Sequence, residues 1–64
     1  MLLKELKKGD YFTRKELLYP NDNQVWIRGD YDRTTKRYSC INWSDINREI
    51  FLKGDTKVYN EMIF

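Results

Sequence analysis

The sequence predicts an all-β fold, a single five-stranded antiparallel barrel of the SH3-like type, with an OB-like barrel as the alternative. The chain has no Ala, and 16% of its residues are aromatic. Val, Ile, Thr, Tyr, Phe and Trp, the residues that favour strands, fill its structured runs. The nearest approach to a helical stripe is Leu2, Leu3 and Leu6, which Gly9 ends after at most two turns. Short strands joined by tight turns are typical of small barrels.

Turn-forming residues set the boundaries of each strand. The strands are predicted at residues 11–14, 24–32, 37–43, 48–52 and 56–64. Gly9 precedes the first strand, and Pro20 lies in an Asn- and Asp-rich loop, where Pro fixes φ and the polar side chains bond to nearby backbone. Residues 33–36 form the loop of the central hairpin, 44–47 a second turn or one helical turn, and Gly54 a third.

The length and composition predict one domain, residues 1–64. A chain this short buries only roughly 60% of the surface that its unfolded form exposes. Cys40 is the single Cys and the chain has no His, so neither a disulfide nor a zinc site is expected to reinforce the fold. A lone thiol indicates a reducing, cytoplasmic location. The charged residues 1–8 are expected to be neither a signal peptide nor a membrane anchor.

The residue inventory argues against an enzyme and against a bound metal or cofactor. No His is present to activate a Ser or the Cys, and the three Gly residues are isolated, so no phosphate-cradling loop is expected. Asp30 and Asp32 resemble a paired-carboxylate site, but Arg28, Arg33 and Arg37 lie close in sequence. We interpret these groups as ion pairs between strands. The net charge of +2 permits nucleic-acid binding without favouring it.

The central hairpin predicts which residues form the core. A loop at 33–36 places Tyr31 opposite Tyr38, and side chains alternate between the two faces of a sheet. The expected core face holds Val25, Ile27, Gly29, Tyr31, Tyr38, Cys40 and Asn42. Cys40 is then a small buried hydrophobe and not a reactive thiol.

The opposite face carries the candidate binding residues. In this register Trp26 lies across from Trp43, with Arg side chains around both rings. Barrel closure would bury these rings as a second core; otherwise they form an exposed patch of the kind found at protein interfaces and on single-stranded nucleic-acid platforms. A slip of one residue would exchange the two faces. The candidate partner-binding residues are Trp26, Arg28, Arg37, Trp43 and Arg48.

The functional prediction is a non-enzymatic adaptor that binds a protein partner or a second copy of itself through this face. The alternative is a single-stranded nucleic-acid-binding barrel that uses the same residues. Mild net charge favours the protein partner. No membrane association is expected.

A resemblance covers nearly the whole chain. The runs V-W-I-R-G-D-Y-D-R at 25–33, K-R-Y-S-C at 36–40 and F-L-K-G-D at 51–55, with G-D-Y-F at 9–12, resemble a family of small uncharacterised proteins. That family recurs in gut-bacterial genomes, phages and mobile elements. The resemblance implies one domain and a mobile-element context, and it assigns no site residues.

Overall fold

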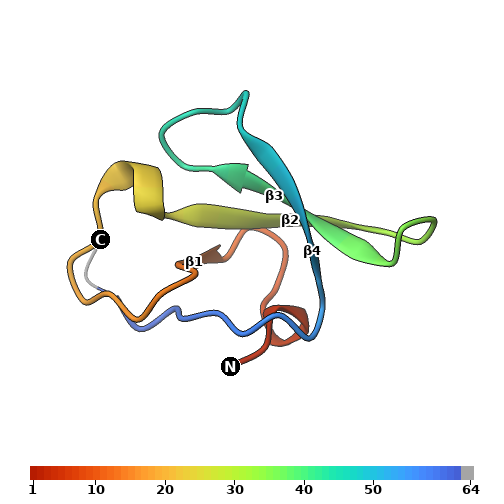
Figure 1. Ribbon diagram of the computed structural model, residues 1–64, viewed down its shortest axis with the longest axis horizontal. Helices are drawn as coiled ribbons and strands as arrows, with labels where there is room; N and C mark the ends of the chain where they lie inside the picture. The colour runs from red at the N-terminus through yellow and green to blue at the C-terminus, as the bar shows by residue number, and fades with distance from the viewer. Residues whose placement is uncertain (63–64) are drawn as a thin grey trace.

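The computed structural model describes residues 1–62 and shows an antiparallel sheet whose four strands follow one another in chain order (Figure 1). The strands are β1 (Tyr11–Phe12), β2 (Trp26–Asp32), β3 (Arg37–Asn42) and β4 (Glu49–Lys53). Two short 3-10 helices, η1 (Leu3–Glu5) and η2 (Asp22–Gln24), lie before β1 and β2. The all-β prediction is confirmed, and four of the five predicted strands are present.

The predicted five-stranded barrel, SH3-like or OB-like, is wrong because the sheet does not close. The predicted fifth strand at 56–64 forms only two isolated bridges, from Lys57 to Leu2 and from Tyr59 to Thr13. Its last two residues lie outside the described part of the chain. These bridges reach the N-terminal segment and the residue after β1, so the segment supports two distant pieces of chain without forming a continuous ladder between β4 and β1.

The core lies on one face of the sheet, here called the inner face. Its fully or nearly buried members are Leu3, Leu6, Phe12, Trp26, Cys40 and Val58, with Tyr38, Ile50 and Leu52 packed against them. Leu3, Leu6 and Val58 come from the segments that cover the sheet, and the other members come from the strands. The predicted burial of Cys40 is confirmed.

A β-bulge in β2 changes the predicted pattern of faces. Near the hairpin tip Tyr31 lies opposite Tyr38, as predicted, but Trp26 lies opposite Asn42 and not Trp43. The register shifts between Arg28 and Tyr31 because β2 contains one residue more than β3 over this stretch. The prediction that Ile27 is core and Trp26 lies on the opposite face is therefore wrong, since the shift exchanges the faces of the first half of β2.

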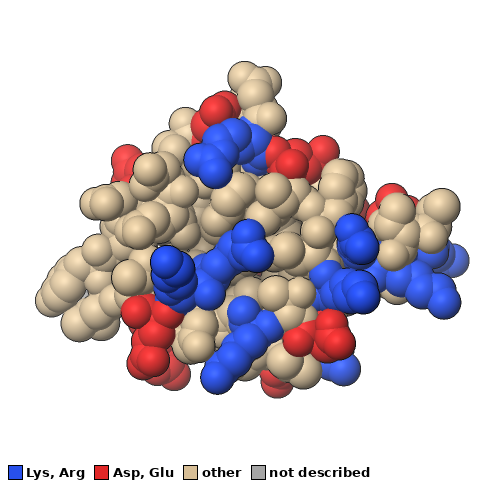
Figure 2. Space-filling model, in the orientation of Figure 1, with Lys and Arg blue, Asp and Glu red and all other residues tan. Residues whose placement is uncertain are grey.

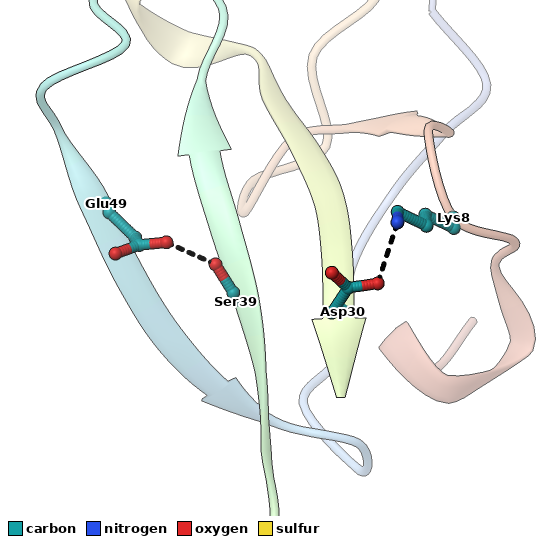
Figure 3. Close-up of polar contacts among 4 residues, drawn as sticks. All are labelled: Lys8, Asp30, Ser39 and Glu49. Atoms are coloured by element: carbon teal, nitrogen blue, oxygen red, sulfur yellow. Dashed lines mark hydrogen bonds and ion pairs between the residues drawn. The ribbon is translucent and has the colours of Figure 1, made fainter. Parts of the chain in front are cut away.

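Gly29 makes this bulge possible. A Cβ atom at position 29 would lie 2.7 Å from the backbone oxygen of Ser39, so any side chain there would force the strands apart. The next residue, Asp30, points to Lys8 and forms an ion pair of 2.8 Å with it (Figure 3). A glycine inside a strand is a known signal of a bulge or of close backbone approach.

Buried Asn42 fixes the end of β3 to the loop before β2. Its Nδ2 donates to the carbonyl oxygen of Asn23 at 2.9 Å. Its Oδ1 accepts from the backbone N–H of Ser44 at 3.1 Å and from the Ser44 hydroxyl at 2.9 Å. These bonds satisfy the polar side chain at a position that the sequence correctly placed in the core.

Candidate functional site

The face of the sheet opposite the core carries a group of large apolar side chains. We call these residues the outer face; they are Tyr11, Ile27, Ile41, Trp43 and Phe51. Tyr11, Ile27 and Ile41 form a row across β1, β2 and β3. Tyr11 is 43% exposed, Trp43 42% and Phe51 45%. Such a grouping of exposed rings on a small domain is typical of an interaction surface.

Two rings of the outer face contact one another. The centroids of Tyr11 and Trp43 lie 5.3 Å apart with an angle of 76° between the ring planes, an edge-to-face arrangement. The backbone N–H of Trp43 donates to the carbonyl oxygen of Val25 at 2.9 Å, which continues the ladder one residue beyond β3. Mutual contact and an anchored backbone hold these large groups in place while much of their surface remains exposed. Because these side chains are already held in place, little side-chain entropy is lost when a partner binds.

Polar and charged groups occupy the rest of this side of the sheet. Ser39 donates a hydrogen bond to the carboxylate of Glu49 on the neighbouring strand (Figure 3). Arg37 lies between Asp32 on β2 and Lys53 on β4 in the strand register. Lys and Arg side chains gather at the tip of the β2–β3 hairpin, at the right of Figure 2. The apolar residues of this face are therefore bordered by charged residues toward the hairpin tip, where Lys and Arg predominate.

The five predicted binding residues do not form one patch. Trp26 belongs to the core and is 6% exposed, whereas Trp43 lies on the outer face. Arg37 is exposed on the same side of β3 as Trp43. The predicted cross-strand pair of Trp26 and Trp43 is wrong for the same reason as the faces: the bulge moves Trp26 into register with Asn42.

The other two predicted arginines stack on rings at the core. The guanidinium carbon of Arg28 lies 4.1 Å from the centroid of the Tyr38 ring, and that of Arg48 lies 5.4 Å from the centroid of the Trp26 ring. These distances are within the range of cation–π attraction. The buried Nε of Arg28 has no hydrogen-bond acceptor in the described chain. Both arginines therefore support aromatic rings of the core.

Arg48 also borders a basic hollow beside Trp26. The hollow is lined by Arg14, Lys15, Leu17, Asn23, Gln24, Trp26 and Arg48. Within residues 1–62 the one salt bridge joins Lys8 and Asp30, so the three cations of this hollow have no carboxylate partner there. An anionic group would be attracted to this hollow. Trp26 offers it little ring surface, because the ring is nearly buried and carries Arg48 over it.

Tyr11, Ile27, Ile41 and Phe51 were not predicted as site residues. The signal that could have found them is Gly29, because a bulge at this glycine transfers Ile27 to the side of Ile41 and Trp43. The pairing of β1 with β2 and of β4 with β3 then places Tyr11 and Phe51 on the same face.

The described residues show no arrangement typical of a metal or nucleophilic site. Among them no group of three or more His, Cys, Asp or Glu side chains could hold a metal ion. Burial raises the pKa of the Cys40 thiol from 9.0 to about 11, so the thiol stays protonated at neutral pH. No helix in this part of the chain is long and apolar enough to cross a membrane.

Comparison with protein-family models, with curated proteins and with solved structures found no match to this chain. The resemblance drawn from the sequence runs therefore stays a prediction.

Proposed function

We propose that this protein is a non-enzymatic binding module that holds a protein partner, or a second copy of itself, against the outer face. The observation that carries the proposal is the group of three rings from β1, from β4 and from the residue after β3, each more than 40% exposed on one side of one sheet. Aromatic side chains with fixed positions are enriched among the residues that dominate binding energy at protein interfaces.

The chemistry of the outer face suits a protein surface better than a nucleic acid. Its central residues are apolar, and Glu49 places a carboxylate beside Phe51. A platform for single strands combines exposed rings with cations that track the phosphates. Here the exposed rings and the basic hollow lie in different places, since the hollow borders Trp26 of the core.

Site-specific photo-crosslinking tests the proposal in cells that produce the protein. A benzophenone amino acid at position 51 is expected to give a discrete adduct with a protein, and excess unlabelled wild-type protein should abolish it. The matched control is the same probe at position 46, because Ile46 is 81% exposed but lies in the β3–β4 loop. An equal pattern of adducts from both positions, or none from position 51, would refute a binding role for the outer face.

A second candidate function, nucleic-acid binding, is favoured by the three cations of the basic hollow, which have no carboxylate partner within residues 1–62. Phosphate contacts would make the affinity fall as the salt concentration rises. For single strands, log K falls by about 0.7 per phosphate contact for each tenfold increase in salt. Titration of single-stranded DNA and RNA with the wild type and with Arg14→Ala tests this candidate. Binding that weakens both with salt and with Arg14→Ala would support it; absence of binding at physiological salt would exclude it.

A further inference from the structure

The outward edge of β4 has the hydrogen-bonding groups of an unpaired strand. The N–H of Asn42 donates to the carbonyl oxygen of Arg48 at 2.9 Å, which fixes the phase of the β3–β4 ladder. In an antiparallel pair, every second residue directs both backbone groups at its partner, and the residues between direct theirs away. The β4 residues whose backbone N–H and C=O groups point away from β3 are therefore Glu49, Phe51 and Lys53.

The described chain leaves much of this edge open. β4 is the last strand of the sheet, and no backbone hydrogen bond within residues 1–62 reaches the outward groups of Glu49 or Phe51. The carbonyl oxygen of Lys53 accepts from Thr56, which marks the end of the open stretch. An exposed edge of this kind is a template for pairing with another strand.

The side chains of β4 are complementary to a second copy of the same strand. An antiparallel pairing centred on Phe51 places Glu49 of each chain opposite Lys53 of the other. Natural edges use charge to prevent such pairing, but charges of opposite sign at equal distances from the centre attract one another across a two-fold axis. A parallel, in-register pairing would instead put Glu49 opposite Glu49.

The charges around Lys53 also favour a carboxylate on its open side. Within its own sheet Lys53 lies opposite Arg37, a residue of the same sign. Like charges directly opposite each other are destabilising, so a carboxylate that arrives from the other side of β4 offsets the repulsion. The same pairing brings the two Phe51 rings together on the outer face and the two Ile50–Leu52 pairs together on the inner face.

We propose that the β4 edge binds the β4 edge of a second copy, antiparallel and centred on Phe51, to form a continuous eight-stranded sheet. This pairing rests on the backbone edge of β4 and its charges, and it shares Phe51 with the outer face. An adduct of the position-51 probe with a second copy would therefore report this pairing, whereas an adduct with another protein would report a partner on the outer face. The paired segment is only five residues long, so we expect a weak dimer with a Kd on the order of 0.1–1 mM.

Charge exchange at two positions tests the register. Sedimentation of the wild type over a concentration series is expected to show a reversible shift from one chain to two. Lys53→Glu puts Glu opposite Glu49, and Glu49→Lys puts Lys opposite Lys53, so each variant alone should stay monomeric at concentrations where the wild type pairs. An equimolar mixture of the two variants should recover the dimer, because every facing pair is then of opposite charge.

The control is Lys7→Glu, which changes the net charge as Lys53→Glu does, at an exposed position outside the sheet; it should pair like the wild type. Circular dichroism confirms that each variant is folded, and hydrogen exchange should show the Phe51 amide protected only in the dimer. A monomeric wild type at millimolar concentration, or a dimer indifferent to both charge changes, overturns the proposal. Failure of the mixture to pair while the wild type does overturns the register. None of these outcomes depends on whether the position-51 probe finds a different protein.

Discussion

Replacement of Gly29 by Ala perturbs the one contact on which the arrangement of both faces depends. The added methyl group would lie 2.7 Å from the carbonyl oxygen of Ser39 and 3.5 Å from its carbonyl carbon. The oxygen belongs to the backbone of β3, so no side-chain rotation can relieve the contact. Either the two central strands separate by several tenths of an ångström or the bulge moves.

The expected cost follows from the general effect of inserting a methyl group where there is no room, about 1–3 kcal/mol. Ala in place of Gly reduces the entropy of the unfolded chain and offsets some of this loss. A chain of 64 residues has a total stability of only about 3–10 kcal/mol, estimated at about 0.05–0.15 kcal/mol per residue. A domain of this size loses roughly 4–8 °C in Tm for each kcal/mol, so Gly29→Ala should melt well below the wild type.

Urea unfolding followed by circular dichroism and by Trp fluorescence measures this loss, because Trp26 is buried in the native state. Asp30→Ala is the matched control: it changes the neighbouring bulge residue but removes only the exposed ion pair with Lys8, which is worth about 0–1 kcal/mol. A Gly29→Ala variant within about 0.5 kcal/mol of the wild type would show that close strand approach does not hold the bulge.

Three further predictions concern single residues. Lys36 has a left-handed φ of 57° in the hairpin loop, so Lys36→Gly should raise the unfolding free energy by up to about 1 kcal/mol in urea titrations; a net loss would contradict the strain. Asn42→Ala leaves the Asn23 carbonyl and the Ser44 N–H without their partner and should cost about 1–3 kcal/mol, whereas an unchanged midpoint would mean that water replaces the amide. The pKa of Cys40 is raised to about 11, so the unfolded chain loses its thiol proton first; this part of the stability is complete below pH 9 and is lost as pH rises through about 11. The difference in stability between the wild type and Cys40→Ala should follow that window, and a pH-independent difference would argue against it.

The hairpin tip and the strand positions could be predicted from local signals. Residues 33–36 fall between two strand-like runs, and Tyr31 and Asp32 lie opposite Tyr38 and Arg37 in the strand register, as predicted. The predicted ion pairs between strands are not found among the described residues, where the one salt bridge joins Asp30 to Lys8. The assignment of faces failed in the part of β2 that precedes Gly29. The bulge changes the register there by one residue, so a pattern of period two places each side chain on the wrong face. Gly29 was visible in the sequence, but its close approach to Ser39 depends on a contact between strands that local patterns do not encode.

Barrel closure failed as a prediction for a different reason. Residues 56–59 look like a strand by composition, yet their hydrogen bonds go to the N-terminal segment and to Thr13. Which partner a short strand chooses is decided by distant segments of the chain. For the candidate site, the sequence identified Trp43 and Arg37 on the outer side of β3, and the same register error placed Trp26 beside them.

The bridge between the two ends of the described chain has a consequence for how the protein folds. The β2–β3–β4 meander joins neighbours in sequence, so its loops close at little entropic cost. Val58 and Leu3 reach the core only when segments more than fifty residues apart meet, as the hydrogen bond from the Val58 N–H to the Met1 carbonyl oxygen shows. We therefore expect the meander to form first and to hold its apolar inner side open to solvent until this last contact is made. The interval before that contact is when the chain is most exposed to aggregation.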